Sequence, residues 1–572
     1  MTSSKFPIHL LSLALPLAST VHAATITSNL GGEWDVAATW SSGAAAPVTG
    51  TQGSGDDYVI ASPFTVISND TASNTQALIG KSVTIQSGAV LDLARLHSSS
   101  TQAVTWNLPP VTIQSGGELQ FRSSTGTSNH TLAASIAVAG TTTIDNTGGG
   151  YGQNIDLSGV FSGSGTVSYK TANSGSATTT RILALKSATS PFSGNWFIQH
   201  GVTTGDDFGA LRADAANALG TGTVTLDTRA QLINNAANGL DSLSGITLQQ
   251  ATSSANLGAG WTNPAGVLTM NGGNVTFGSA TTFSTSSIAS LAHTAGTLQF
   301  DLGPTATDSD RLVLSGNYTT GTAPIDIYLK SDPGSTTYDI LTYGGTRTGT
   351  PSVQLSATTP TRLVPSYSLG SGTNDKITVS FSGTVGNLVW KGNDGTNPNN
   401  WDLNTTSNFA NAGSADKFLI ADTVTFDDTA ASFTPSVIGS LVPRSVTINN
   451  STNAYTFTGT GSISGNTGLT KSGSALATIS TANTFTGNVA VNGGTLTLGN
   501  AGALGGTGNK QVTVASGAAI DFNGISPGTT RTYSYNIAGT GSGSGALVNS
   551  SATSLGANSG ILNLTLTGDA TI

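Results

Sequence analysis

Short runs in which apolar and polar residues alternate recur along the chain, and they constrain its fold more than any other feature. In a β-strand successive side chains point to opposite faces, so a period of two residues is typical of a strand that is buried on one side. Gly, Asn and Ser separate the runs and favour turns between them. The clearest runs are residues 82–85, 111–113, 142–144, 223–226, 495–498 and 511–514.

Glycine-rich corners punctuate these runs, and no long helical pattern lies between them. Asn271-Gly272-Gly273 and Asn492-Gly493-Gly494 are two such corners. No stretch of ten residues or more shows the 3.6-residue period of an amphipathic helix, which excludes parallel strands joined by helical crossovers. Only 9% of the residues are charged while 37% are hydrophobic, a balance that argues against disorder. The chain is therefore predicted to be all-β.

Repeated short strands with glycine-rich corners and unequal spacers predict a parallel β-solenoid with about 20 to 25 residues per coil. Stacked coils place like side chains above one another, which hydroxyl and amide groups tolerate and like charges do not. This stacking gives a physical reason for the low charge. Tandem β-sandwiches remain the alternative, because their strands alternate as well.

Several blocks occur in the same order in both halves of the chain, which predicts two successive arrays. The boundary is expected near Gly383 to Gly386, with a first array at 24–385 and a second at 386–572. Because the chain ends inside a repeat, we expect the second array to be incomplete at its C-terminus. The paired blocks are Trp34 to Trp40 with Trp390 to Trp401, 56–60 with 422–428, 82–85 with 445–448, and 192–195 with 485–488.

The first residues have the layout of a secretory signal peptide. Lys5 is followed by an apolar run from Ile8 to Ala18, and Val21-His22-Ala23 offers small residues at the cleavage position. We expect residues 1–23 to be a signal peptide, and we expect no other membrane span. The mature chain is then secreted or placed at the cell surface.

Charge and cysteine content exclude several classes of function. Twenty Lys plus Arg against 29 Asp plus Glu give a net charge of −9, and the basic residues form no cluster that could neutralise phosphates, so nucleic-acid binding is not expected. The absence of cysteine rules out thiolate zinc sites, iron–sulfur clusters and a cysteine nucleophile. We expect no cofactor and no metal.

The acidic and histidine residues do not form a legible catalytic site. Glycoside hydrolysis needs two carboxyls that face each other, whereas adjacent residues of a strand point to opposite faces. Asp308 and Asp310, beside Arg311, are the one close pair expected to share a face, and a polar turn before residues 312–314 is the preferred interpretation. We predict no catalytic residues. The other candidates weighed are Asp56-Asp57, Asp206-Asp207 and Asp427-Asp428, and the isolated His97, His130, His200 and His293, with His9 and His22 in the signal peptide.

The tryptophans allow two interpretations. Exposed in a row, they would stack on sugar rings; buried, they would fill the core or cap the first coil of each array, and we favour capping for the Trp34/Trp40 and Trp390/Trp401 pairs. The remaining tryptophans are Trp106, Trp196 and Trp261.

One stretch carries a recognisable motif. Lys471-x-Gly473, Asn483-Thr484-Phe485-x-Gly487 and Gly494-x-Leu496 follow one another within about 30 residues. This stretch resembles the autotransporter-associated β-strand repeat of bacterial surface passengers, and residues 192–219 resemble a degenerate copy. The resemblance implies a right-handed parallel β-helix at or beyond the outer membrane of a Gram-negative-type bacterium, and it implies no catalytic residues.

We therefore expect an exported solenoid with a structural or adhesive role and no catalytic activity. Its partner would be an extracellular polysaccharide or the surface of a host or neighbouring cell. Two alternatives remain open. A polysaccharide lyase or hydrolase would need Asp and Lys or Arg from different coils to meet in one groove, and a carbohydrate-binding module would need a coplanar row of exposed aromatic side chains.

Overall fold

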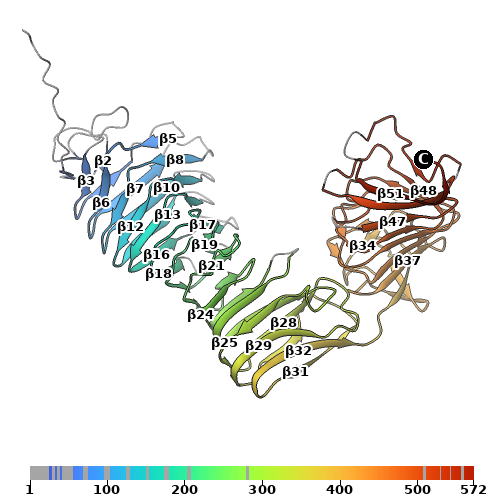
Figure 1. Cartoon of the computed structure of the whole chain (residues 1–572), viewed down its shortest axis with the longest axis horizontal. Helices are drawn as coiled ribbons and strands as arrows, with labels where there is room; N and C mark the ends of the chain where they lie inside the picture. The colour runs from blue at the N-terminus through green and yellow to red at the C-terminus, as the bar shows by residue number, and fades with distance from the viewer. Residues whose placement is uncertain are drawn as a thin grey trace, which may run out of the picture. The chain divides into compact units, whose positions relative to one another are not determined.

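The structure is a computed structural model (Figure 1) whose regular structure is β-strand. The expected signal peptide, residues 1–23, lies outside the described residues. Within the described residues no α-helix is present, which confirms the all-β prediction. The described residues are 25–28, 32–34, 39–40, 56–68, 75–95, 103–123, 129–149, 154–172, 180–201, 208–278, 282–506, 510–528, 530–541, 543–555 and 559–572.

The chain divides into two compact units. Unit 1 consists of Met1–Leu183 with Pro191–Gly194, and unit 2 consists of Ala184–Ser190 with Asn195–Ile572. Strand β17 (Thr180–Leu185) spans the point of division. Each unit is described by itself below.

Unit 1 consists of three parallel stacks of short strands, because each coil contributes one strand to each stack. The first stack contains β1 (Thr25–Thr27), β3 (Asp57–Ile60), β6 (Ser82–Ile85), β9 (Val111–Ile113), β12 (Ile136–Ala139) and β15 (Phe161–Ser164). The second contains β2 (Gly32–Glu33), β4 (Thr65–Ile67), β7 (Val90–Arg95), β10 (Glu118–Ser123), β13 (Thr142–Gly149) and β16 (Thr166–Thr171). The third contains β5 (Thr75–Ala77), β8 (Val104–Asn107), β11 (His130–Leu132) and β14 (Ile155–Leu157).

The core of unit 1 is a set of apolar columns that run across the stacked coils. In the first stack Val83 pairs with Val111, Val111 with Ile136, and Ile136 with Phe161, and all four side chains are buried. The residues that follow them along each strand, Thr84, Thr112, Ala137 and Ser162, are only half-buried, as the alternation predicts. A coil cannot shield its inward face alone, so each one depends on its neighbours.

The first part of unit 2 continues with parallel strands. β18 (Asn195–His200), β20 (Thr223–Leu226), β22 (Gly245–Leu248) and β24 (Thr262–Thr276) form one series, and β19 (Phe208–Ala213), β21 (Ala230–Asn234) and β23 (Ser254–Asn256) form a second that also reaches β24. Strand β25 (Thr285–Leu302) pairs with β24, then with β26 (Arg311–Leu314), β27 (Tyr318–Thr320) and β28 (Pro324–Leu329). The predicted corner at 271–273 lies inside β24, where the register shifts and Gly273 has a φ of +73°.

Not every pair of strands is parallel. β29 (Tyr338–Thr348) and β31 (Val364–Leu369) both pair antiparallel with β32 (Thr373–Ser382), while β30 (Ser352–Leu355) pairs parallel with β28. The loop Gly370-Ser371-Gly372 joins β31 to β32, and a three-residue loop that contains glycine is typical of a hairpin. The prediction of purely parallel pairing is therefore wrong for β29, β31 and β32. The glycine-containing loop at 370–372 is the sequence feature that indicates this hairpin.

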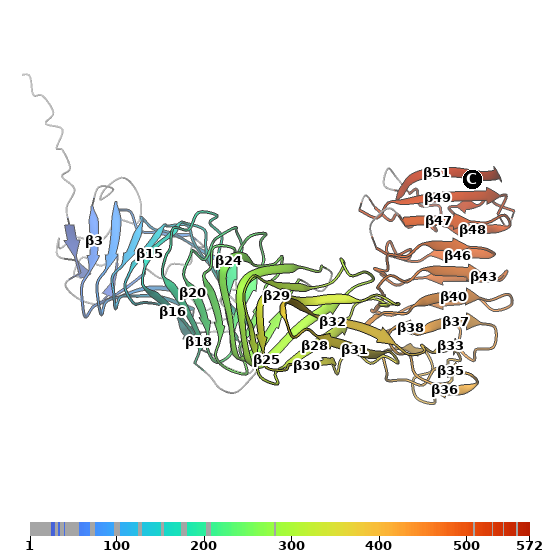
Figure 2. The same ribbon diagram turned by 60° about the horizontal axis from the view of Figure 1, so that its bottom comes forward.

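The last part of unit 2 is a regular parallel stack, whose strands appear as successive rungs in Figure 2. Its main series is β33 (Asn387–Trp390), β37 (Thr423–Asp427), β40 (Ser445–Asn449), β43 (Leu469–Ser472), β45 (Val489–Val491), β47 (Lys510–Val514), β49 (Tyr533–Gly539) and β51 (Ile561–Ala570). The antiparallel strands β35 (Phe409–Asn411) and β36 (Ser414–Asp416) extend it beyond β33.

The other faces of these coils are also parallel. One series contains β41 (Tyr455–Phe457), β44 (Leu476–Ile479), β46 (Gly494–Leu498), β48 (Ala518–Asp521) and β50 (Leu547–Val548). Two parallel pairs complete the coils: β34 (Asn400–Trp401) with β38 (Ser436–Val437), and β39 (Ser440–Leu441) with β42 (Ser462–Ile463). The mostly parallel pairing confirms a β-solenoid, and the alternative of tandem β-sandwiches is wrong.

The six runs singled out in the sequence all lie in strands, namely β6, β9, β13, β20, β46 and β47. The predicted array bounds, 24–385 and 386–572, stay a prediction. The strands up to β32 and those from β33 onward belong to different sheets.

The two copies of the repeat motif make the same contacts, which explains what the motif does. Phe485 is buried, a Cβ on Gly487 would overlap the carbonyl group of the preceding coil, and Asn488 Oδ1 accepts a hydrogen bond from a backbone N–H of the next coil (3.1 Å). Residues 192–195 repeat all three features, with a hydrogen bond of 2.9 Å to Asn195 Oδ1. The motif therefore holds consecutive coils close together.

Candidate functional site

Most acidic pairs singled out in the sequence support the coils themselves. Asp428 accepts hydrogen bonds from the backbone N–H groups of residues 451–453, at 2.7 to 3.1 Å, and these bonds lower its pKa. Asp427 Oδ1 accepts one from the backbone N–H of Thr429 (2.9 Å), and Asp57 Oδ1 accepts one from a serine hydroxyl (2.6 Å). Their hydrogen bonds are those of turn and strand-edge residues. Asp206 and Asp207 lie outside the described residues.

Asp308 and Asp310 do not share a face, contrary to the prediction. Asp310 is completely buried, whereas Asp308 is exposed. Both lie before β26, which begins only at Arg311. The alternation of an extended strand does not apply there, because the chain turns between β25 and β26.

The histidines are core residues. His130 is buried, stacks on Trp106 with 5.9 Å between ring centroids, and accepts a hydrogen bond at Nδ1 from the indole N–H (3.0 Å). His293 is buried beside the Tyr318 hydroxyl (3.3 Å), and burial lowers its pKa. His200 is buried as well. Among the described residues no three His, Asp or Glu side chains come together as metal ligands; outside those residues lie His9, His22 and His97.

All seven tryptophans are buried. Trp390 and Trp401 pack against Phe409 and Phe426, with ring centroids 5.1 to 6.2 Å apart. The tryptophans therefore belong to the core and offer no row of exposed rings for stacking on sugars. Their side chains are at most 1% exposed: Trp34, Trp40, Trp106, Trp196, Trp261, Trp390 and Trp401.

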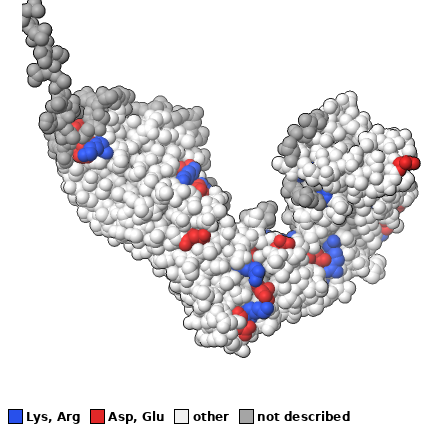
Figure 3. Space-filling view, in the orientation of Figure 1, with Lys and Arg blue, Asp and Glu red and all other residues white. Residues whose placement is uncertain are grey.

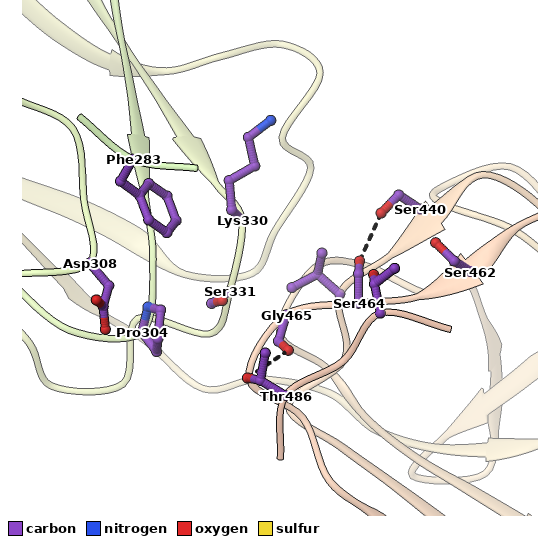
Figure 4. Close-up of a pocket in the computed structure, with 12 residues that line it drawn as sticks. Phe283, Pro304, Asp308, Lys330, Ser331, Ser440, Ser462, Ser464, Gly465 and Thr486 are labelled. Atoms are coloured by element: carbon purple, nitrogen blue, oxygen red, sulfur yellow. Dashed lines mark hydrogen bonds between the residues drawn. The ribbon is translucent and has the colours of Figure 1, made fainter. Parts of the chain in front are cut away.

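A pocket of about 510 Å³ lies within unit 2, and we call it the hydroxyl-lined pocket (Figure 4). One wall comes from the β25–β26 turn and the residues around it, and the other from consecutive coils of the last stack. The first wall consists of Phe283, Pro304, Asp308, Lys330 and Ser331, and the second of Ser440, Val442, Ser462, Ser464, Gly465, Thr484 and Thr486.

The second wall presents hydroxyl groups at regular intervals because its residues belong to three successive coils. Ser440 in β39 pairs with Ser462 in β42, and the backbone N–H of Thr484 in the next coil bonds to the carbonyl of Ile463 (2.9 Å). Neighbouring strands are about 4.8 Å apart. The Ser440 and Ser464 hydroxyls are hydrogen-bonded to each other (2.7 Å).

The first wall combines an aromatic ring with two opposite charges. Phe283 is half-buried, and its ring lies close to Gly303, where a Cβ would come within 2.7 Å of the ring. Asp308 Oδ2 accepts a hydrogen bond from the Thr305 hydroxyl (2.8 Å). Lys330 Nζ lies 3.4 Å from Asp301 Oδ2.

A buried carboxyl lies beneath this wall. Asp310 accepts hydrogen bonds from the backbone N–H groups of Ser284 (2.9 Å) and Asp301 (3.0 Å), one at each oxygen. Burial raises the pKa of Asp310 to about 7, and burial also raises the pKa of Asp301. Because both oxygens of Asp310 already accept backbone bonds, this carboxyl holds the turn rather than facing the pocket.

Ionic and amide contacts hold the two walls together. The Arg444 guanidinium forms two hydrogen bonds with the Asp332 carboxylate, at 2.5 and 2.8 Å. The backbone N–H of Asp332 donates to Asn466 Oδ1 (3.1 Å), next to Gly465 of the pocket. A bidentate pair of this kind fixes geometry better than a single contact does.

The pocket can bind a ligand by hydrogen bonding and stacking. Its lining offers hydroxyl donors and acceptors, one carboxylate, one ammonium group and one aromatic ring. Of the acidic, histidine and tryptophan candidates that the structure describes, Asp308 alone lines it. Lys330 and the serines could not have been singled out, because serine is common along the chain and the coils that bring these residues together are far apart in sequence.

Comparison with known proteins gives one limited similarity. A stretch of 62 residues, 11% of this chain, is 40% identical to part of "Adhesin BmaC autotransporter" of Brucella suis biovar 1 (strain 1330), and the match covers 2% of that protein. No protein-family model matches the chain. No solved structure matches it.

The described residues contain no helix of the length and apolarity that crossing a membrane requires.

Proposed function

We propose that this chain is an exported, surface-exposed solenoid that acts as an adhesive protein without catalytic activity. The observation that carries the proposal is the stack of parallel coils with an almost uncharged surface, of which Figure 3 shows one face. Such a stack presents long rows of hydroxyl and amide groups at a fixed spacing. The 62-residue similarity to an adhesin supports the same role.

Sparse charge suits this role. Solenoids offer extended surfaces for binding, and rows of serine and threonine bind through many weak contacts rather than through one charged site. A surface position and export are supported by the signal-peptide pattern at residues 1–23 and by the resemblance of residues 468–496 to a passenger repeat.

Polysaccharide cleavage is the second candidate, because Asp308 and Lys330 come from different coils and line one pocket. Hydrolysis needs two carboxyls that face the glycosidic bond. Asp308 is the one carboxylate in the described lining, and Lys330 is paired with Asp301. These contacts favour binding over cleavage.

The proposal is tested in a Gram-negative host that expresses the full chain. We expect mass spectrometry to find the mature N-terminus after Ala23, and we expect protease added to intact cells to reach the chain. Beads coated with the purified protein should adhere to bacterial cells or to extracellular polysaccharide above an albumin-coated control. Cytoplasmic retention or adhesion equal to the control would refute the proposal.

A further inference from the structure

We propose that the hydroxyl-lined pocket binds a short stretch of a neutral oligosaccharide. The inference rests on the proposed adhesive function and names the ligand class for one site. Thr484 and Thr486 belong to the repeat motif, but that motif by itself indicates no ligand. The inference follows from the side chains that unit 2 brings together there.

The first argument is free hydrogen-bonding capacity. Within the described chain the Ser462 and Thr484 hydroxyls have no side-chain partner, although both line the pocket. By contrast, Ser440 and Ser464 bond to each other (2.7 Å), and the Thr486 hydroxyl donates to the Gly465 carbonyl (3.3 Å). A hydroxyl both donates and accepts. The Ser462 and Thr484 hydroxyls, on neighbouring coils, match a ligand that itself carries several hydroxyl groups.

The second argument is the aromatic ring. Phe283 is half-buried and lines the pocket together with Pro304 and Val442. The glycine at 303 gives the ring its position, because a side chain there would overlap it. A sugar ring has an apolar C–H face as well as hydroxyl edges. One aromatic face with a few placed polar groups is the usual composition of a small-molecule site.

The third argument is the charge balance. The lining contains one carboxylate, Asp308, and one ammonium group, Lys330, and the latter lies 3.4 Å from Asp301. An anionic glycan would need an excess of cationic groups, and a cationic glycan would need an excess of carboxylates. Asp308 has one oxygen bonded to Thr305, and its other oxygen is free to accept from a sugar hydroxyl. The pocket therefore favours a neutral ligand.

The fourth argument is size. A volume of about 510 Å³ lies within the range of sites that bind small molecules, about 300 to 1,000 Å³. That space exceeds what a single ion needs and suits a short oligosaccharide.

The test is calorimetric titration of the purified full chain with defined probes. The neutral probes are cellotetraose, mannotetraose and chitotetraose, the anionic probe is a galacturonate tetramer, and the peptide probe is a Ser/Gly-rich octapeptide. We expect at least one neutral tetrasaccharide to bind, and the anionic and peptide probes to bind at least about tenfold more weakly. Product chromatography on the same samples should find the tetrasaccharide intact.

Variants locate the binding. Asp308→Asn and Phe283→Ala should each weaken the neutral tetrasaccharide about tenfold or more, since each removes one contact that the ligand uses. Ser462→Ala is a milder change, with an expected loss of severalfold. Ser366→Ala is the matched control, because this hydroxyl lies on the exposed strand β31 and is absent from the pocket lining. Circular dichroism establishes that each variant is folded.

Each outcome bears on one proposal. The inference is wrong, even though adhesion persists, if no neutral tetrasaccharide binds or if the peptide or the anionic probe binds best. It is also wrong if the three folded pocket variants, Asp308→Asn, Phe283→Ala and Ser462→Ala, all bind the tetrasaccharide like the wild type. If chromatography finds the tetrasaccharide cut into shorter sugars, the pocket cleaves its ligand and the inference of binding alone is wrong. If a tetrasaccharide binds at the pocket but coated beads do not adhere, the inference stands and the adhesive function is wrong.

Discussion

At the scale of single residues, two lysines inside the core of unit 2 are the least expected feature. Lys471 stands in an inward column between Ile448 and Val491, and its ammonium group donates to backbone carbonyls at 2.6 to 3.2 Å. Lys510 donates to the carbonyls of two coil corners, both at 2.7 Å, and lies 3.9 Å from the centroid of the Phe485 ring. Burial lowers the pKa of Lys471 to about 8 and that of Lys510 to about 7.

Lys510→Met should flatten the pH dependence of stability. The folded pKa of about 7 lies below the unfolded value of 10.5, so the unfolded chain binds more protons between these pH values. The free energy of unfolding should therefore rise with pH from about 7 to about 10, by up to about 1.4 kcal/mol per pH unit for this group. Urea unfolding at pH 7, 8.5 and 10 measures the slope.

The exposed Lys81→Met serves as control for Lys510→Met, since its side chain is 66% exposed. It should leave the slope unchanged. Lys471 contributes to the slope in the same direction, so Lys510→Met removes only part of it. An equal slope in the wild type and Lys510→Met would contradict the assignment.

Gly473, the glycine of the Lys-x-Gly motif, should not tolerate alanine. Its φ is +73°, and a Cβ would overlap the carbonyl group of Asn450 in the preceding coil. We expect Gly473→Ala to lower the free energy of unfolding by at least about 2 kcal/mol. Gly395→Ala is the matched control, because a Cβ there meets nothing within 4 Å, and it should change stability by less than about 1 kcal/mol. Thermal melts of the wild type and both variants measure these changes in stability.

At the scale of strands, register places each side chain inside or outside. In β40 Ile448 is buried between Phe426 of the preceding coil and Lys471 of the next, whereas its neighbour Thr447 is only half-buried. Ile448→Ala should cost about 2 to 5 kcal/mol, and Thr447→Ala should cost less than about 0.5 kcal/mol. If denaturant melts give the two variants equal losses of unfolding free energy, the alternation of residues does not decide which side chains form the core.

Across the whole molecule, the scarcity of charge implies stability that salt hardly changes. Charged residues are 9% of the chain, and exposed ion pairs contribute little to stability in any case. Burial of apolar columns and backbone hydrogen bonding therefore carry most of the stabilisation. Raising NaCl from about 0.1 to about 0.5 M screens ion pairs and should move the free energy of unfolding by less than about 1 kcal/mol. If salt lowers the free energy of unfolding by more than this in denaturant titrations, ion pairs contribute much of the stability.

The fold was largely predictable because its rules are local. Alternation in residues 82–85 or 511–514 needs only neighbouring residues, and both are strands. The hairpin between β31 and β32 was not predicted, because a glycine-containing loop such as 370–372 suits a hairpin and a coil corner equally well. The burial of Asp310 was not predicted, because a turn, unlike a strand, does not fix where a side chain points.

The hydroxyl-lined pocket was not predictable. Asp308 was a candidate, but Lys330, Phe283 and Ser462 carry no motif. Apart from Thr484 and Thr486 of the repeat motif, no sequence pattern separates the serines of the pocket lining from the many others along the chain. Their proximity depends on the turns and ion pairs that join distant coils, such as the pair between Asp332 and Arg444.

The sequence by itself determined that this chain forms stacked parallel strands, since alternation and glycine corners act over a few residues. Tertiary structure alone decided which polar groups meet. Coil register brought Ser440 and Ser462 side by side, and burial separated Asp310 from Asp308. The reason is physical: strand formation depends on near neighbours along the chain, whereas a binding site depends on contacts between coils that are remote in sequence.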